Sequence, residues 1–343
     1  MKKFKRLLAL GLSLTLLASC SPKEPDPTPE PTPTPVETPA PDPVTVNVAM
    51  LKGTTGLGAA KLMVDGSQNE TYTYNFSLLG EATEAVAALT KGEVDIAAVP
   101  TNLASTLYHK LDGGVQLAAL NTLGVLYILE NGESVNDLAD LKGKTIHAFG
   151  QGANPEFVLN YLLEENDLKA GEDVTVEWYS STDEVSTRIA SGEVELAMLP
   201  VPAATAAQIQ SQGKVRFAID LTQVWQDAGA QGVLTMGCVV VRTEFAQAHP
   251  EAVDAFLKEY GDSIAYMSDP ANLEDAAACA EQAGIIPKAA VAKKALPDAN
   301  LCFITGDDMM DGIQGYYQVL FAADPASIGG SIPDGAFYYS YNP

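Results

Sequence analysis

The feature that most constrains this chain is a ten-residue pattern that occurs twice, with a spacing of 100 residues. Residues 91–100 read KGEVDIAAVP and residues 191–200 read SGEVELAMLP. In both copies a helix-forming stretch precedes the glycine, which is a natural helix stop. A short apolar strand follows the glycine and ends at proline. The pattern therefore predicts a helix–strand unit that the chain builds twice.

The same spacing aligns the segments that come before this pattern. Each copy begins with a buried strand and a glycine-containing loop that opens a helix, and a second strand follows. The paired segments are 46–49 with 146–149, 52–56 with 150–155, and 72–78 with 174–180. Alternating strands and helices predict an α/β fold of two similar lobes with parallel sheets and right-handed crossovers. The alternative is that two ordinary α/β segments resemble each other through shared secondary structure, and it predicts the same fold class.

The remaining segments predict how the chain passes between the two lobes. Asn121 and Thr122 lie between two strand patterns and form the first expected crossing, and residues 234–237 form the second. The chain after the second crossing is strongly helical, at 249–267, 273–283, 288–296 and 307–321, and we expect it to pack back on the first lobe. The predicted division is 45–122 plus 238–343 for lobe I and 123–237 for lobe II.

The N-terminal segment reads as an export signal followed by a tether. Residues 1–19 carry a basic start and an apolar run that is shorter than the ~20 residues needed to cross a bilayer. The run ends in LASC, which resembles a bacterial lipobox and makes Cys20 the expected lipid anchor. The alternative is an ordinary signal peptide with an incidental cysteine. Residues 20–44 hold ten prolines and predict a stiff, solvated, lipid-anchored linker.

Composition excludes several classes of function. The net charge of −24 disfavours binding to nucleic acid or to anionic lipid. The three histidines are not spaced for a zinc site, and the chain has neither a Gly-x-Ser-x-Gly elbow nor a Walker phosphate loop. We therefore expect no catalytic residue, no metal and no cofactor. With Cys20 lipidated, the odd number of other cysteines predicts buried thiols, while a bridge between Cys279 and Cys302 stays open.

Taken in order along the chain, the motifs resemble ABC-transporter substrate-binding proteins of the nitrate/sulfonate/taurine and NMT1/THI5-like (thiamine pyrimidine) group. The residues that carry the resemblance are the lipobox, MLKGTTG at 50–56, GEVDIA at 92–97, DLKGK at 140–144, HPEAV at 249–253 and SIGGSIP at 327–333. The resemblance implies a type II periplasmic-binding-protein fold with a ligand held between two hinged lobes. It also implies an ABC permease and its ATPase as partners, a monomer, and a place outside the cytoplasm on the bacterial cell membrane.

A ligand site is expected where strands end, because open α/β sheets bind ligands at the carboxyl ends of strands near helix N-termini. Glycines there allow close backbone approach, and Thr and Asn supply short polar groups. The candidate ligand-binding residues are Lys52, Gly53, Thr54, Thr55, Gly56, Leu79, Gly80, Pro100, Thr101, Asn102, Asn121, Thr122, Gly152, Asn154, Pro200, Pro202 and Trp225. The alternative for the Thr and Asn residues is that they cap their own helices.

The identity of the ligand stays open between two classes. Lys52 is the one cation in a predicted cleft loop, which argues against a dianion but allows a sulfonate- or nitrate-like anion. Trp225 or Tyr108 could stack on a pyrimidine-type heterocycle, although each is also a candidate packing residue. Two other functions are weighed: a lipoprotein that senses a ligand without transport, and a THI5-like pyrimidine-synthesis enzyme. The cysteine-rich segment of those enzymes has no counterpart here.

Overall fold

The computed structural model describes residues 43–230 and 232–342. The predicted signal peptide, Cys20 and nearly all of the proline-rich linker lie outside the described residues. None of the helices in the described part of the chain has both the length and the apolar run that crossing a membrane requires.

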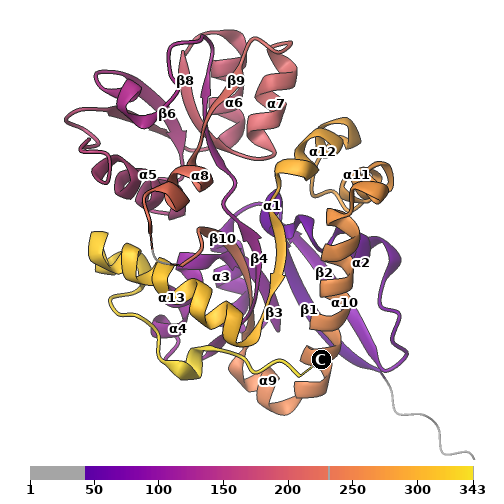
Figure 1. Ribbon diagram of the computed structural model, residues 1–343. Helices are drawn as coiled ribbons and strands as arrows, with labels where there is room; N and C mark the ends of the chain where they lie inside the picture. The colour runs from indigo at the N-terminus through magenta and orange to yellow at the C-terminus, as the bar shows by residue number, and fades with distance from the viewer. Residues whose placement is uncertain (1–42, 231, 343) are drawn as a thin grey trace, which may run out of the picture. The chain divides into compact units, whose positions relative to one another are not determined.

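Two β-sheets organise the described chain (Figure 1). The first has six strands in the order β11-β4-β10-β3-β1-β2, and the second has five in the order β7-β6-β8-β5-β9. The strands of the first sheet are β1 (Val44–Leu51), β2 (Tyr72–Leu79), β3 (Ile96–Pro100), β4 (Val115–Leu123), β10 (Thr235–Arg242) and β11 (Leu301–Ile304). Those of the second are β5 (Leu126–Glu130), β6 (Thr145–Phe149), β7 (Thr175–Tyr179), β8 (Leu196–Pro200) and β9 (Arg216–Asp220).

Helices cover these sheets and close the crossovers between strands. They are α1 (Thr54–Leu57), α2 (Ala60–Asp65), α3 (Ala82–Lys91), α4 (Thr101–Lys110), α5 (Asn154–Glu164), α6 (Thr182–Ser191), α7 (Ala203–Gln210), α8 (Leu221–Asp227), α9 (Thr243–Ala248), α10 (Pro250–Ser268), α11 (Leu273–Gln282), α12 (Ala289–Ala295) and α13 (Gly306–Ala323). Short 3-10 turns lie at Leu138–Leu141, Pro270–Asn272, Leu296–Asp298, Pro325–Ile328 and Gly335–Phe337. We call the first sheet with α1–α4 and α9–α13 the six-stranded half, and the second sheet with α5–α8 the five-stranded half.

The predicted repeat is confirmed by the elements themselves. Helices α3 and α6 are offset by 100 residues, as are strands β3 and β8. Gly92 and Gly192 end the two helices with φ of 71° and 80°, the left-handed conformation that glycine adopts without strain. The strand orders β2-β1-β3 and β7-β6-β8 are also equivalent, and both triplets are parallel. The α/β class and the internal duplication were therefore readable from one sequence.

The sheets differ from the expectation of all-parallel strands. Strand β10 runs antiparallel to both β3 and β4, and β5 runs antiparallel to both β8 and β9. These reversed strands come directly after the chain passes between the halves. A strand that enters a sheet from the edge where the parallel strands end has to run in the opposite direction.

The first crossing lies slightly later than predicted. Asn121 and Thr122 belong to β4, which continues to Leu123 because Leu123 pairs with Thr235 and its amide donates to the Asn300 carbonyl at 3.0 Å. Gly124 and Val125 therefore connect the two sheets. On the return, β10 already begins at Thr235, inside the segment predicted as the second crossing.

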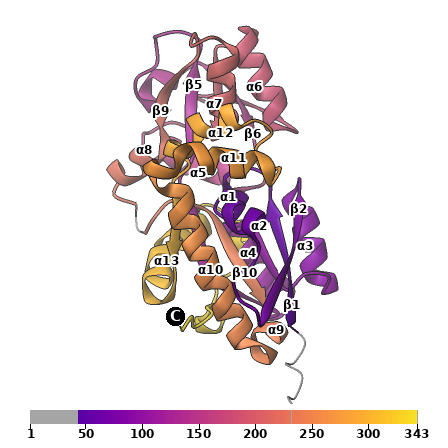
Figure 2. The same ribbon diagram turned by 90° about the vertical axis from the view of Figure 1, so that its right-hand side faces the viewer.

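The core of the six-stranded half lies on both faces of its sheet. One face of β1 packs through Val46 and Val48 against α10, where Phe256 and Tyr260 are buried. The opposite face packs against α4 and α13, and Figures 1 and 2 show these helices on the other side of the sheet from α10. Burial on both faces explains why β10 reads as an almost continuous apolar run.

The three cysteines in the described part of the chain are free thiols. Cys238 and Cys279 are buried, as predicted, whereas Cys302 is half-buried. The bridge between Cys279 and Cys302 that the sequence left open is not formed. Burial raises the pKa of the Cys302 thiol to about 12, so this side chain is protonated at neutral pH.

Candidate functional site

The carboxyl ends of the central strands meet at the crossing between the two halves. In the six-stranded sheet, β3 ends at Pro100, which pairs with Gly237, while the start of β10 at Thr235 pairs with the end of β4. In the five-stranded sheet, β8 ends at Pro200, which pairs with the start of β5. The Val201 amide donates to the Val125 carbonyl at 3.0 Å, so the crossing chain touches the end of β8 directly. The carboxyl ends of the central strands of both sheets, where open α/β sheets bind ligands, therefore lie beside the same crossing segment.

Two helices begin at these strand ends without a side-chain cap. Helix α4 follows Pro100 directly and α7 begins at Ala203, just beyond Pro200, so they occupy equivalent places in the repeat. The backbone amides of residues 101–103 and 203–205 have no acceptor among the described residues. Uncapped amides at the positive end of a helix form a ready site for an anion or a carbonyl oxygen.

The helices that follow the edge strands are capped by contrast. Ser181 Oγ accepts the Glu184 amide at 3.2 Å at the start of α6, and Glu84 Oε2 accepts the Gly80 and Glu81 amides at 3.0 and 3.1 Å before α3. Within the repeated unit, the helices that follow the edge strands are thus capped, whereas α4 and α7 begin without a side-chain cap, as do α1 and α5. Each open helix also holds, in its first turn, a buried polar atom with no partner in the described chain: Asn102 Oδ1 in α4 and Thr205 Oγ1 in α7.

The predicted residues of β4 form a buried support rather than an open surface. Asn121 Nδ2 donates to the Thr55 carbonyl and to the Tyr260 hydroxyl, both at 3.0 Å. Thr122 Oγ1 lies 3.3 Å from the Thr54 carbonyl and 3.0 Å from Asn121 Oδ1, and can donate to either acceptor. This network fixes the backbone of residues 54–55 against the sheet.

The loop held by this network contains predicted residues that range from exposed to buried. Lys52 is exposed, Gly53 and Thr55 are half-buried, and Thr54 keeps 7% of its surface accessible. Across the described part of the chain, no ion pair forms at Lys52 and no hydrogen bond forms at the Thr54 hydroxyl. Leu79 is half-buried and Gly80 exposed at the neighbouring strand end. The loop thus offers one ammonium group and free hydroxyls.

Residues 101 and 102 bond chiefly to the protein itself. Thr101 Oγ1 lies 3.3 Å from Thr235 Oγ1, and its carbonyl accepts the Tyr317 hydroxyl at 2.8 Å. Asn102 Nδ2 donates to the Ser327 carbonyl at 3.3 Å and so holds the C-terminal segment against α4. The Tyr108 hydroxyl likewise donates to Asp334 at 2.6 Å, which favours its packing interpretation.

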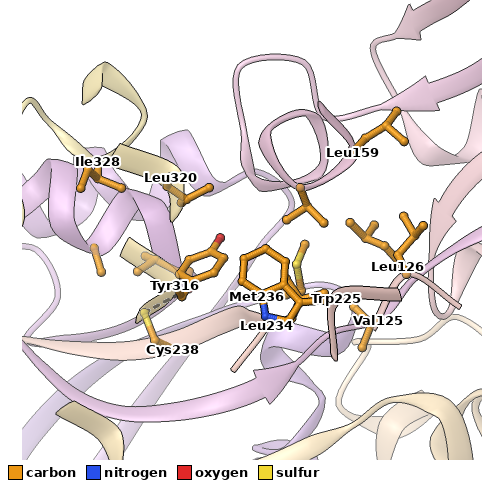
Figure 3. Close-up of a cluster of buried hydrophobic side chains, with 14 of the residues drawn as sticks. Val125, Leu126, Leu159, Trp225, Leu234, Met236, Cys238, Tyr316, Leu320 and Ile328 are labelled. Carbon is orange, nitrogen blue, oxygen red and sulfur yellow. Dashed lines mark hydrogen bonds between the residues drawn. The ribbon is translucent and has the colours of Figure 1, made fainter. Parts of the chain in front are cut away.

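The predicted residues of the five-stranded half differ in how exposed they are. Gly152 is exposed, but its amide donates to Glu156 Oε2 at 2.6 Å, and Pro200 and Pro202 are half-buried. Asn154 is 1% exposed, and its amide group is engaged on both sides. Trp225 is also 1% exposed and lies in the packed cluster that Figure 3 shows. Its burial matches the packing alternative rather than stacking on a ligand.

Several residues of this region carried no signal in the sequence. Four such residues contact the predicted ones, yet they come from the C-terminal helices α10 and α13 or from the first residue of β10: Tyr260, Tyr316, Tyr317 and Thr235. Their partners lie 134 to 216 residues away in sequence. An apolar helical period predicts that such tyrosines are buried, but it does not say which strand end they face.

The arginines of the described chain are committed to ion pairs away from the strand ends. Arg242 pairs with Asp95 at 3.1 Å, at the start of β3, and Arg216 pairs with Glu130 at 2.6 Å, at the end of β5. Arg188 pairs with Glu184 on α6 at 3.0 Å. These charges are therefore not free to bind an anion beside the crossing.

The Glu130 carboxylate shows how strongly one of these pairs is held. Burial alone would raise its pKa, but hydrogen bonds from Ser134, from the Val135 amide and from Arg216 outweigh burial and lower the pKa below its ordinary value. The carboxylate is charged at neutral pH and serves to bind the loop after β5. Its role is structural, at the sheet edge opposite the crossing.

One sizeable groove lies away from the strand ends. A groove of about 660 Å³ runs between α2, the loop that follows it and α10. Its central carboxylate, Glu259, accepts hydrogen bonds from Ser67, from the Gln68 amide and from Tyr74 at 2.9 to 3.1 Å. These bonds are made within the wall of the groove. No group of three or more potential metal ligands occurs among the described residues.

Comparison with known proteins gives one family and a consistent fold. The family model described as NMT1/THI5 like matches residues 80–272, which is more than half of the chain. No curated protein matches the chain in a sequence comparison.

Among solved structures, an ABC transporter protein from Parabacteroides distasonis is 20% identical, with a TM-score of 0.70 over 87% of this chain and 100% of that chain. The periplasmic aliphatic sulphonate binding protein of Escherichia coli is 15% identical, with a TM-score of 0.69 over 88% and 93%. The alkanesulfonate-binding protein of Xanthomonas axonopodis pv. citri, solved bound to MOPS, is 16% identical, with a TM-score of 0.63 over 83% and 94%. At these identities the likeness is one of fold, and it confirms the two-sheet, periplasmic-binding-protein-like architecture.

Proposed function

This chain belongs to the NMT1/THI5-like family, and from that membership we propose that it is an extracytoplasmic solute-binding lipoprotein that captures a small molecule for an ABC importer. The named structural relatives are binding proteins of transport systems rather than enzymes. We extend that role to this chain because its fold and its strand-end chemistry suit reversible capture. The permease and its ATPase are the proposed partners, and the binding protein is proposed to act as a monomer.

The observation that carries the proposal is the pair of equivalent open helix N-termini beside the crossing. Helices α4 and α7 each follow the end of a central strand, one in each sheet, and each leaves its first-turn amides without a partner among the described residues. Buried amides are normally paired, so unpaired ones that recur at both copies of a repeat point to a ligand as their missing acceptor.

The charge near these helices narrows the class of ligand. Lys52 supplies one cation, whereas the arginines of the described chain are already paired elsewhere. A singly charged anion of the sulfonate or nitrate type fits two sets of amides and one ammonium group. A neutral pyrimidine-type heterocycle, whose ring acceptors need the same donors, is the second candidate. A dianion would leave a charge without compensation.

We also propose how the halves divide and how the protein is anchored. The lobes comprise about residues 45–122 plus 238–343 and 123–237, with hinge motion in the crossings around Gly124 and Gly232. Cys20 is the proposed attachment point of the lipid, and the proline-rich segment is the tether. Fatty-acid labelling of the expressed protein checks the anchor, and a protein that takes up no label would remove it from the proposal.

A thermal-shift screen tests the binding function. Purified protein without the signal peptide is heated with sulfonates, nitrate, pyrimidines, thiamine and amino acids. A ligand present at 100 times its dissociation constant stabilises a protein by about 2.7 kcal/mol, which raises the melting temperature by several degrees. Uptake of the identified ligand should then fall when the gene is deleted. Binding with unchanged uptake would favour the sensing lipoprotein, and chemical conversion of the ligand would favour the enzyme.

A further inference from the structure

Helix α13 connects the two halves through one buried side-chain pair. The Tyr316 hydroxyl donates to Asn154 Oδ1 at 2.7 Å, and the two residues are 0% and 1% exposed. Asn154 is the first residue of α5, in the five-stranded half, whereas Tyr316 belongs to the six-stranded half. The same asparagine donates from Nδ2 to the Met236 carbonyl of β10 at 3.4 Å. One amide group therefore bonds two separate elements of the opposite half.

An aromatic contact lies directly beside this hydrogen bond. The Trp225 ring of α8 has its centroid 5.8 Å from Tyr316 and 5.0 Å from Tyr161 of α5. Figure 3 shows the indole and Tyr316 next to each other in the buried cluster. Trp225 thus reports on the same junction that Asn154 and Tyr316 form.

The return crossing is attached to the same helix. The Val233 amide donates to the Gly312 carbonyl of α13 at 3.0 Å. A Cβ on Gly232 would lie 2.4 Å from that carbonyl oxygen, and its φ of 74° favours glycine in any case. Helix α13 therefore holds the crossing at Gly232, the start of α5 and the aromatic ring of α8.

From these contacts we propose that Tyr316 is a positioning residue, which acts through Asn154 to hold the start of α5 against the six-stranded half. Asn154 is not the cap of α5, because that position is Ala153, and both sides of its amide group are used between the halves. The pair thereby sets how readily the five-stranded half moves at the proposed ligand site. The role of this hydrogen bond in ligand capture rests on the proposed function, whereas its role in holding the start of α5 does not.

Amide hydrogen exchange of the ligand-free protein tests the proposal. Loss of a buried hydrogen bond shifts a local opening equilibrium by roughly tenfold, so Tyr316→Phe should speed exchange in the first two turns of α5 by about that factor. Tyr317→Phe is the matched control. Tyr317 is equally buried on the same helix, but its hydroxyl bonds the Thr101 carbonyl within the six-stranded half. This variant should speed exchange near the start of α4 and leave α5 unchanged.

Two further variants keep the test decisive. Asn154→Ala should reproduce the effect of Tyr316→Phe on α5 and α13, and combining the two changes should add little, because both remove one contact. In a Trp178→Phe background, Trp225 is the remaining tryptophan, and acrylamide should quench it more strongly in Tyr316→Phe than in Tyr317→Phe. Equal acceleration of α5 by both tyrosine variants, or equal quenching, overturns the proposal. A failed ligand screen would instead count against the proposed function alone.

Discussion

Positions 54 and 154 are equivalent in the repeat, yet the two halves use them in different ways. Thr54 begins α1, keeps a hydroxyl free of partners in the described chain and remains 7% exposed. Asn154 begins α5 and is 1% exposed, and both the oxygen and the nitrogen of its side-chain amide form hydrogen bonds with the six-stranded half. The comparison teaches that equivalent positions of a duplicated unit can take different roles: the hydroxyl of Thr54 has no partner in the described chain, whereas the amide group of Asn154 forms a contact between the halves.

The helices that follow these positions differ for a local reason. In the six-stranded half, α1 spans four residues and stops before α2, whereas α5 continues for eleven. Position 56 is glycine and its counterpart 156 is glutamate. A Cβ on Gly56 would lie 2.0 Å from the Leu51 carbonyl oxygen, so only glycine lets α1 turn this tightly against its own strand.

The largest predicted effect comes from breaking that close approach. Gly56→Ala should lower the free energy of unfolding by about 3 kcal/mol or more, because backbone rather than a flexible side chain occupies the space of the new methyl group. Urea denaturation followed by circular dichroism measures the loss. Glu156→Ala is the matched control in the other half. It loses one bond to the Gly152 amide and should cost under about 1 kcal/mol. Equal losses of unfolding free energy in the two variants would show that the backbone of α1 is no more tightly packed than that of α5.

A second comparison lies at the opposite edges of the sheets, where each half carries one buried carboxylate–arginine pair. Asp95 and Arg242 bind the start of β3 in the six-stranded half, and Asp95 also accepts the Asn47 amide at 2.9 Å. Glu130 and Arg216 bind the end of β5 in the five-stranded half. Each pair fixes a central strand at the end that faces away from the crossing.

Glu130→Gln should destabilise the protein by about 2 kcal/mol at neutral pH, because the buried carboxylate loses the charge that strengthens its hydrogen bonds from Ser134, from the Val135 amide and from Arg216. The pKa of Glu130 is lowered in the folded protein, so the stability it contributes is present above its unfolded pKa near 4.5. That contribution is lost as the pH falls through the lower folded value. Urea melts between pH 7 and pH 3 should therefore show wild type and variant converging in acid. A gap that stays constant down to pH 3 would mean that the charge of Glu130 does not contribute.

How far the sequence predicts this molecule depends on the range of the interactions involved. The repeat, the helix ends at Gly92 and Gly192 and the four C-terminal helices follow from local patterns, and the structure confirms them within one or two residues. The first crossing, at Gly124 and Val125, lies three residues later than the expected Asn121 and Thr122. Nothing local reveals that Leu123 still pairs with Thr235 and bonds Asn300.

The candidate site was less predictable because its contacts are distant in sequence. The rule that ligands bind at strand ends points to these edges, and this stays a prediction. The same rule could not separate Thr54 from Asn154. That distinction depends on Tyr316, which lies 162 residues beyond Asn154. The same limit applies to Asn121, a candidate ligand-binding residue whose amide group bonds Thr55 and Tyr260 instead. The sequence thus proposes a region, and packing decides which of its polar groups remain without a partner in the described chain.

The smallest predicted effect tests whether positions 54 and 154 have different roles. Thr54→Ala should weaken binding of the ligand identified by thermal shift by about 5- to 10-fold, the effect of losing one hydrogen bond, while stability changes by under about 0.5 kcal/mol. Asn154→Ala should lower the free energy of unfolding more than it weakens ligand binding, because it leaves the buried Tyr316 hydroxyl without its acceptor. Isothermal titration and urea melts of both variants give the two numbers. If Thr54→Ala alters stability but not affinity, then the Thr54 hydroxyl does not contact the ligand. The exposed Lys52 ammonium and the open amides of α4 and α7 would then be the remaining donors for the ligand.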